Sequence, residues 1–424
     1  MSAEVKHGYK LTEVGVIPED WEVKQIQDLC GFIVPGRNKP RVFDGNIPWI
    51  TTHDLDDGRA VYDSKLMLRV SISEASSVGS KVVPAGSVLM SCVGELGIVA
   101  IAGCDIVINQ QLHAFLPSVS INKVFLAYII KCQVSHIKSV ATKTALPYLN
   151  KDNCNSIPIQ VPSVSEQEAI AEVLSDADAL IESLEQLITK KRQIKQGAMQ
   201  ELLTGKKRLP GFSGEWEVKK LGDLFSFSGG YSASRDQLSS EGHCYLHYGD
   251  IHGSSKMTID AKGDYQNIPK LNIPLKRIAS NSLLEDGDVV FVDASEDDKG
   301  TSRYIVVVNK DDIPFIAGLH TIVAKSKTSE LTHEYRRYCF QTADIHQQFL
   351  FFAVGTKVSG ISKSNIPKLT LPVPPFPEQA AIAEILMDME AEIEVRAENL
   401  EKTRQLKQGM MRNLLTGKIR LLKM

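Results

Sequence analysis

VPSVSEQEAIAEVL (161–174) recurs as VPPFPEQAAIAEIL (373–386), and this repeated stretch decides the fold. The same offset of 212 residues (161 to 373) relates KQGAMQELLTGKKRL (195–209) to KQGMMRNLLTGKIRL (407–421), with no insertion or deletion between the stretches. A long internal repeat sets the architecture of a chain. The sequence therefore predicts the order module, long helix, module, long helix.

The domain boundaries follow from this repeat. We place the first module at 1–160, the central helix at 161–208, the second module at 209–371 and the distal helix at 372–424. A chain of 424 residues is long enough for two or three domains. Weak echoes relate the two modules, because WITTHDL aligns with YLHYGDI and VVPAGSVLM with LLEDGDVVF. These echoes place Asp54 opposite Asp250 and Gly86 opposite Gly287.

Both modules mix short apolar runs with polar loops. Four runs predict strands: SVLMSCV (87–93), IVAIA (98–102), DVVFVD (288–293) and YIVVVN (304–309). One short helix is expected in each module, around 124–132 and 332–340. Each module is therefore predicted to be an α+β domain.

The repeated segments predict two long helices. Residues 166–204 contain no proline, and Ser165 with Glu168 fits a capping box. Apolar residues recur at the alternating four–three spacing of a coiled-coil seam, which Arg396 interrupts once. The seam positions are Ile170, Leu174, Ala177, Ile181, Leu184 and Ile188 in the first helix, and Ile382, Leu386, Met389, Ile393 and Leu400 in the second.

Charge is segregated along both helices, with acids in the first half and bases in the second. The helix dipole alone favours this distribution. It also suits an antiparallel pair, in which each acidic half lies beside the basic half of the other helix. An antiparallel coiled coil would relate the two modules by a pseudo-two-fold axis, which fits a ligand with two separated sites such as double-stranded DNA.

Polar loop residues of both modules are candidate DNA contacts. Arginine and lysine suit guanine edges and phosphates, and asparagine and glutamine suit adenine edges. Each residue taken singly can equally be an ordinary solvated loop residue. The first set is Arg37, Lys39, Arg41, Thr51, Thr52, His53, Asn109, Gln110, Gln111, Lys143 and Tyr148. The second set is Tyr231, Arg235, His247, Tyr248, Arg303, His320, Lys357, Ser359 and Lys363.

The chain shows no catalytic signature of its own. PVPPF (372–376) resembles an amino-methyltransferase loop, but Val373 stands where the catalytic Asn or Asp would be. FVDASEDDKG (291–300) loosely imitates a nuclease site through Asp297 and Lys299, and the first module lacks that set. No phosphate loop or methyl-donor loop occurs. We therefore expect no catalytic residue, bound cofactor or metal in this chain.

The bulk composition points to a reducing compartment. The seven cysteines show no CxxC or zinc-ligand spacing, and the N-terminus has no apolar core of a signal peptide. No apolar run is long enough to span a membrane, so we expect a soluble cytoplasmic protein. The net charge of −3 is unusual for a DNA-binding protein.

The order of these motifs resembles the specificity subunit of type I restriction–modification systems. The resemblance covers essentially the whole chain and rests on the twice-occurring EQ-x-x-IA-E and LLTGK motifs, together with YKLTEVGVIPEDWEV (9–23). It implies that the modules are target recognition domains, each reading half of an asymmetric bipartite DNA site. It also implies that the helices set the gap and dock two methyltransferase subunits and the restriction subunits. S-adenosylmethionine, ATP and Mg would then be bound by those partners.

Two other functions stay open at this stage. A coiled-coil scaffold whose modules bind proteins agrees with the slightly negative charge. A fused restriction enzyme with activity of its own would require a donor-binding or nuclease motif.

Overall fold

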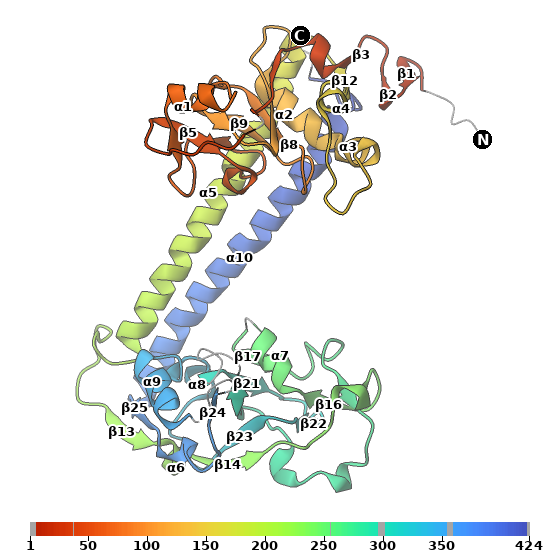
Figure 1. Ribbon diagram of the computed structural model, residues 1–424. Coiled ribbons are helices and arrows are strands. Elements are labelled where there is room, and N and C mark those ends of the chain that lie inside the picture. The colour runs from red at the N-terminus through yellow and green to blue at the C-terminus, as the bar shows by residue number, and fades with distance from the viewer. Residues whose placement is uncertain (1–5, 37, 255, 296–301, 354–358, 422–424) are drawn as a thin grey trace. The chain divides into compact units, whose positions relative to one another are not determined.

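The computed structural model describes residues 6–421 except 37, 255, 296–301 and 354–358. The chain forms two compact units (Figure 1). The first unit comprises 1–185 with 398–424, and the second comprises 186–397. Two long helices, α5 (Val164–Leu202) and α10 (Phe376–Leu414), each contribute one part to each unit.

The first unit is built on a five-stranded sheet of order β4-β11-β8-β9-β6, beside a three-stranded sheet of order β10-β5-β7. Its strands are β1 (Tyr9–Thr12), β2 (Gly15–Pro18), β3 (Glu22–Gln25), β4 (Phe32–Ile33), β5 (Ile47–Ile50), β6 (Ala60–Val61), β7 (Arg69–Val70), β8 (Val88–Ser91), β9 (Val99–Ala102), β10 (Val107–Ile108), β11 (Leu112–Phe115) and β12 (Pro158–Val161). Its other helices are α1 (Ile72–Ser77), α2 (Lys123–Cys132), α3 (Val134–Val140) and α4 (Lys151–Asn155).

The second unit has a five-stranded sheet of order β14-β23-β19-β21-β17 and a four-stranded sheet of order β15-β18-β16-β22. Its strands are β13 (Glu217–Lys220), β14 (Phe225–Gly229), β15 (Leu238–Ser239), β16 (His243–Leu246), β17 (Thr258–Asp260), β18 (Lys270–Leu271), β19 (Val289–Val292), β20 (Ala294–Ser295), β21 (Tyr304–Val308), β22 (Phe315–Ala317), β23 (Thr321–Ser326), β24 (Ser359–Gly360) and β25 (Thr370–Val373). Its other helices are α6 (Leu221–Leu224), α7 (Tyr248–Gly253), α8 (His333–Cys339) and α9 (Ala343–Phe352).

The two units share one topology although their sequences diverge. In each five-stranded sheet the central strands are antiparallel and the last edge strand is parallel to its neighbour (β6 to β9, β17 to β21). The predicted strands at 87–93, 98–102, 288–293 and 304–309 are confirmed as β8, β9, β19 and β21. The expectation of one short helix per module was too low, because the described chain also contains α1, α3 and α4 in the first unit and α6, α7 and α9 in the second.

Alternation along the central strands gives each sheet two buried faces. In β8, Val88 and Met90 pack toward α2 and α5, whereas Leu89 packs toward Ile50 and Ile108 of the smaller sheet. In β19 of the second unit, Phe291 packs toward α8 and Val290 packs toward β16 and β22. Each smaller sheet is therefore fixed against the face opposite the helices.

The start of α5 corrects one sequence-based expectation. The helix begins at Val164, and the hydroxyl of Ser163 accepts a hydrogen bond from the amide of Glu166 (3.3 Å). The cap is therefore Ser163 and not Ser165. The sequence favoured Ser165 because Glu168 completes a capping box with it, but Ser163 has Glu166 at the same spacing.

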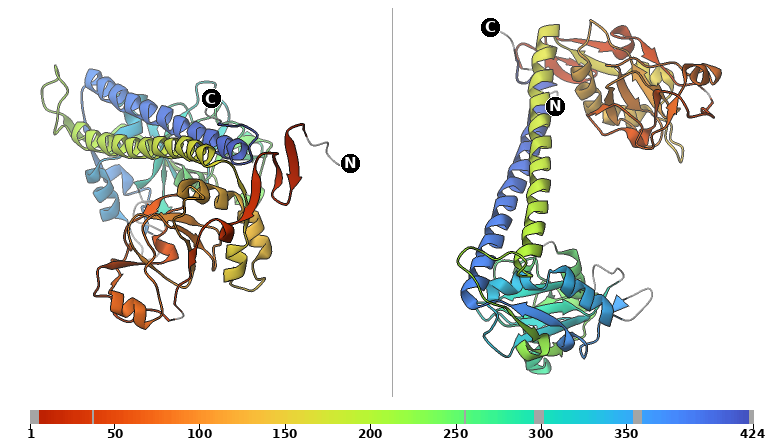
Figure 2. Two further views of the ribbon diagram at one scale, coloured as in Figure 1. Left: turned by 90° about the horizontal axis from the view of Figure 1, so that it is seen from above. Right: turned by 90° about the vertical axis from the view of Figure 1, so that its left-hand side faces the viewer.

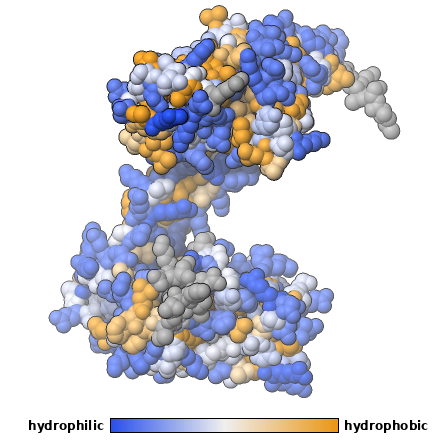
Figure 3. Space-filling view, viewed as in Figure 1, coloured by the Kyte–Doolittle hydropathy of each residue, from blue (hydrophilic) through white to orange (hydrophobic). Residues whose placement is uncertain are grey.

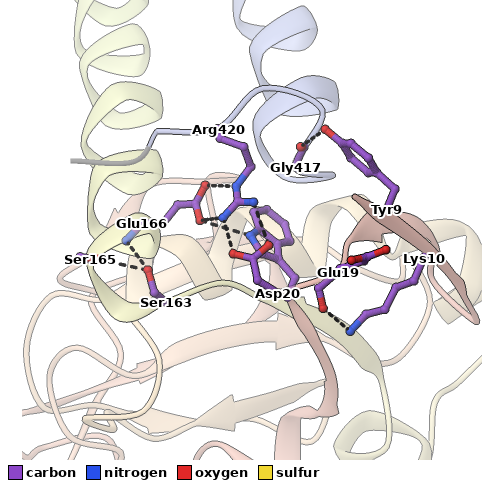
Figure 4. A network of polar contacts seen from close by, with 10 residues as sticks. Tyr9, Lys10, Glu19, Asp20, Ser163, Ser165, Glu166, Gly417 and Arg420 are labelled. Carbon is purple, nitrogen blue, oxygen red and sulfur yellow. Dashed lines mark hydrogen bonds and ion pairs between the residues drawn. The ribbon is translucent and has the colours of Figure 1, made fainter. Parts of the chain in front are cut away.

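The repeated Glu-Gln pair ties each helix start to its module. In the first unit the Glu166 carboxylate is 1% exposed and accepts bonds from Trp21 Nε1 (3.2 Å) and from two nitrogens of Arg420 (2.7 and 2.8 Å). Arg420 also binds Asp20 through both terminal nitrogens (2.9 and 2.8 Å), and this contact lowers the pKa of Asp20 (Figure 4). Beside it, Gln167 accepts a bond from the amide of Asn122 (2.9 Å).

The second unit repeats this arrangement with the equivalent residues. Glu378 is 1% exposed and binds Trp216 Nε1 (2.9 Å) and two nitrogens of Arg208 (2.6 Å each). Gln379 accepts a bond from the amide of Thr332 (2.9 Å). The paired Glu and Gln are therefore a structural motif, which needs an arginine from the end of the other repeat.

Further along the helices, ion pairs join the acidic half of one helix to the basic half of the other. In the first unit Lys407 contacts Asp178, which also accepts from the Tyr128 hydroxyl (2.5 Å), and Arg404 contacts Glu185 (2.7 Å). As the residue number of the partner in α5 rises, that of the partner on the side of α10 falls, so these parts of the two helices run antiparallel, as Figure 2 also shows.

The second unit has the matching pairs. Lys195 contacts Glu390, which accepts from the Tyr338 hydroxyl (2.7 Å), and Lys191 contacts Glu392 (2.9 Å). The charge segregation predicted these contacts. In both units the seam positions are buried or half-buried, whereas the helices also carry exposed apolar side chains at Leu180, Val395 and Leu406.

The face of the molecule seen in Figure 3 is mainly polar. On the face shown in Figure 3, hydrophilic residues cover most of both units, and hydrophobic residues form small scattered patches. None of the helices in the described part of the chain combines the length and the apolar character that crossing a lipid bilayer requires.

Candidate nucleic-acid interface

A pair of parallel strands brings polar loops together in the first unit. Strands β5 and β10 are parallel, with Trp49 opposite Val107 and Ile50 opposite Ile108. Parallel neighbours end at the same edge of a sheet, where ligands commonly bind. Thr51-Thr52-His53 follow β5 and Asn109-Gln110-Gln111 follow β10, so the structure places six of the predicted contact residues side by side.

Hydrogen bonds fix the position of these loops. The Asp54 carboxylate accepts from the amide and the hydroxyl of Thr51 (2.7 and 2.8 Å), which caps the short turn after β5. Thr52 donates from its hydroxyl to Gln111 Oε1 (3.1 Å), which joins the two loops directly. The Gln110 side chain donates to the carbonyls of Gly36 and Asn38 (2.9 and 3.0 Å) and thus supports the preceding loop.

The remaining predicted contacts of the first unit lie in neighbouring loops. Lys39 lies over the ring of Trp49 (5.3 Å to the ring centre), and His53, Arg41 and Lys143 are exposed. Tyr148 pairs through its backbone with Val93, just after β8, and its side chain is exposed. Arg37 lies outside the described residues.

The second unit repeats the site at the equivalent strands. Strands β16 and β22 are parallel, with Leu246 opposite Ala317. His247-Tyr248 follow β16 and Gly318-Leu319-His320 follow β22. The rings of Tyr248 and His320 meet edge to face at 5.4 Å between their centres. The structure therefore gathers predicted contacts at the same place in both modules.

Backbone geometry marks His320 within this site. Its φ of 58° lies in the left-handed region, which non-glycine residues rarely adopt. Its Nδ1 contacts Asp293 Oδ1 (3.1 Å), and its carbonyl accepts from the amide of Asp293 (3.2 Å). Strain of this kind often accompanies a functional position.

His247 and Arg235 border this site. His247 is nearly buried and its Nδ1 accepts from the amide of Gly249 (3.1 Å), while burial, and secondly Arg235, lower its pKa. Arg235 is exposed and lies 3.9 Å from the Asp250 carboxylate. The carboxylate of Asp250 accepts from the amide of His247 (3.1 Å), as Asp54 does for Thr51. The weak alignment of Asp54 with Asp250 thus reflects an equivalent cap.

The other predicted contacts of the second unit are spread more widely. Arg303 donates to the carbonyl of His252 at the end of α7, and Tyr231 is half-buried beside β22. Ser359 pairs with Ser295 through the backbone of β24, and Lys363 is exposed. Lys357 lies outside the described residues.

Sequence reasoning missed Asp293 and His252 as neighbours of the site. Asp293 holds His320, and the His252 ring lies 6.1 Å from the Tyr248 ring. Asp293 is the last residue of the predicted strand 288–293, and that position was the available signal. The nuclease-like pair Asp297 and Lys299 lies outside the described residues. Within the described ranges, no cluster of three or more His, Cys, Asp or Glu side chains could hold a metal ion.

The two units are thus duplicated α+β modules that present different side chains at one equivalent site. The chain belongs to the family of type I restriction–modification specificity subunits, since the model of the type I restriction modification DNA specificity domain matches residues 18–196 and 213–403. The members of this family to which the chain is similar are named as specificity subunits of type I restriction enzymes.

Relatives and solved structures match along nearly the whole chain. The type I restriction enzyme MjaIX specificity subunit of Methanocaldococcus jannaschii is 23% identical, covering 97% of this chain and 96% of the relative. The MjaVIII specificity subunit of the same organism is 26% identical, covering 95% and 94%. The S subunit from M. genitalium has a similar fold, with a TM-score of 0.54 at 15% identity over 96% of this chain and 97% of that one.

Proposed function

We propose that this specificity subunit reads an asymmetric bipartite DNA site, with one half-site for each module. The observation that carries the proposal is the recurrence of one polar site, at the ends of β5 and β10 and of β16 and β22, with different side chains in each. A shared frame with different contact residues is what reading two different sequences requires.

The proposal assigns the long helices the role of a spacer. The antiparallel ion pairs within each unit support an antiparallel coiled coil of α5 and α10, with the modules related by a pseudo-two-fold axis. Such a pair would set the number of unread base pairs between the half-sites. The exposed apolar residues Leu180, Val395 and Leu406 would be available to partner subunits.

Partner subunits supply the chemistry in this proposal. Two methyltransferase subunits bind S-adenosylmethionine and methylate adenine, and restriction subunits bind ATP and Mg and cleave DNA. The chain itself holds the DNA and selects the sequence.

The test is to co-express the chain with the methyltransferase encoded beside it and to map methylated adenines on a plasmid by long-read sequencing. The expected result is a single asymmetric motif with a fixed unread gap. The methyltransferase expressed alone is the control and should give no motif. A continuous motif would contradict the two-module reading, and a stable complex without methylation would favour a protein scaffold.

A further inference from the structure

The orientation of one side chain in the first module is fixed by its neighbours. The backbone amide of Gln111 donates to Asn109 Oδ1 (3.1 Å). A backbone N–H can only donate, so this bond identifies the oxygen of the Asn109 amide. Its other atom is therefore the nitrogen, and Asn109 Nδ2 donates to Gln111 Oε1 (3.0 Å).

This chain of bonds leaves Gln111 only one group to offer a ligand. Gln111 Oε1 accepts from Asn109 Nδ2 and also from the Thr52 hydroxyl (3.1 Å), which uses both of its lone pairs. The amide nitrogen Nε2 is hydrogen-bonded to none of the described residues in the structure. Gln111 is half-buried and Asn109 is buried, so the arrangement is held within the fold.

We propose that Gln111 is a specificity-determining residue that acts as a pure hydrogen-bond donor toward a base-edge acceptor in the first half-site. The usual pairing of glutamine with adenine uses the amide as donor and acceptor together. Gln111 cannot make that pairing here, because its Oε1 already accepts from Asn109 and Thr52. The acceptors that fit are purine N7, guanine O6 and thymine O4. Asn109 is a positioning residue, which acts through Gln111. This inference rests on the proposed function.

The equivalent position in the second module carries a different group. The carbonyl of Gln111 accepts from the amide of Cys92 (2.8 Å), as the carbonyl of His320 accepts from the amide of Asp293 (3.2 Å). His320 therefore occupies the place of Gln111. A carboxylate that holds Nδ1 leaves Nε2 as the outward ring nitrogen. One position thus carries different hydrogen-bonding chemistry in the two modules.

Two variants test the donor role with the full chain and its methyltransferase. Gln111→Met removes the donor, so discrimination at one base pair of the first half-site should fall at least tenfold. Asn109→Asp offers an acceptor where Nδ2 was, so the Gln111 amide should turn over and present its oxygen. The preferred base at that same position should then change to cytosine or adenine, whose N4 or N6 amino group can donate a hydrogen bond to the exposed oxygen. The readout is the methylated fraction of each single-base variant of the motif.

Controls separate this inference from the proposed function. Gln27→Met makes the same substitution at an exposed glutamine of the first unit and should leave the motif unchanged. The second half-site and the gap should stay constant in every variant, which shows that the protein is folded. A wild-type chain without a bipartite motif would overturn both proposals. A wild-type motif that both variants read with unaltered base preference would overturn the role of Gln111 alone.

Discussion

At the scale of single residues, the most demanding groups are the buried carboxylates Glu166 and Glu378. Each is 1% exposed, forms an ion pair with an arginine and accepts a hydrogen bond from a tryptophan N–H. Breaking a buried ion pair costs more than the pair contributes, because the remaining charge is left without a partner. The motif therefore tolerates little change at its arginine.

Removing that arginine should destabilise the first unit. We expect Arg420→Met to lower its free energy of unfolding by about 3 kcal/mol, since Glu166 keeps only Trp21 as a donor. Hydrogen exchange of the β3 and β12 amides measures the effect. The exposed Lys418, two residues earlier, is the control, and Lys418→Met should change stability by less than about 0.5 kcal/mol. Equal effects of the two variants would contradict the structural role of Arg420.

A buried histidine should make stability depend on pH. His113 contacts Asn155 Oδ1 (2.9 Å), and burial lowers its pKa from 6.5 to about 4. In the unfolded chain His113 is protonated below about pH 6.5, whereas in the folded chain it is protonated only below about pH 4. The free energy of unfolding therefore falls as the pH decreases from 6.5 to 4. The loss should reach about 3 kcal/mol at pH 4.

The substitution His113→Gln should remove this part of the pH dependence, because glutamine can still donate to Asn155 and does not titrate. Urea unfolding between pH 7 and pH 4 checks the prediction. His7→Gln changes an exposed histidine and should follow the wild-type curve. If His113→Gln also follows the wild-type curve, His113 is not the source of this pH dependence.

At the scale of elements, the sequence predicted the helices and strands that have a clear apolar periodicity or a segregated charge pattern. Apolar runs located β8, β9, β19 and β21, and the four–three spacing located α5 and α10. The other short helices, α1, α3, α4, α6, α7 and α9, were missed, since elements of this length depend on tertiary packing more than on local propensity. The parallel pairing of β5 with β10 was also beyond the sequence, because residues far apart in the chain form it. That pairing decides which polar loops meet.

Helix contacts of similar appearance should differ in strength. Lys407 is 13% exposed, contacts Asp178 and lies over the ring of Tyr128 (5.1 Å to its centre). Lys402 is 72% exposed and lies 3.7 Å from Glu398 in the same helix. We expect Lys407→Met to lower the stability of the first unit by about 1–2 kcal/mol and Lys402→Met by less than about 0.5 kcal/mol.

Urea unfolding of the two lysine variants at low and at high salt checks this difference. The loss at Lys407 should largely persist in high salt, since the Lys407 side chain is mostly buried and a partly buried pair is screened less than an exposed one. A loss that disappears in high salt would reduce Lys407 to a surface contact.

At the scale of the whole molecule, the shared topology and the divergent site separate two tasks. The elements that repeat closely, α5, α10 and the Glu-Gln motifs, build the frame, whereas the loops after β5 and β10 and after β16 and β22 differ. Selectivity can therefore change by substitution in the loops without cost to the frame. In the same way, the proposed spacing should change through the helices alone.

Lengthening both helices tests that separation. Inserting seven residues after Ile188 and seven at the matching position Leu400 keeps the apolar seam in register and adds about 10 Å to each helix. The unread gap of the methylated motif should lengthen, while both half-sites keep their sequences, because no residue of either recognition site is altered. After insertion into α5 alone, the pairs Lys195–Glu390 and Asp178–Lys407 can no longer form at the same time, so this control should impair assembly. Altered half-sites with a constant gap would show that the helices do not set the spacing.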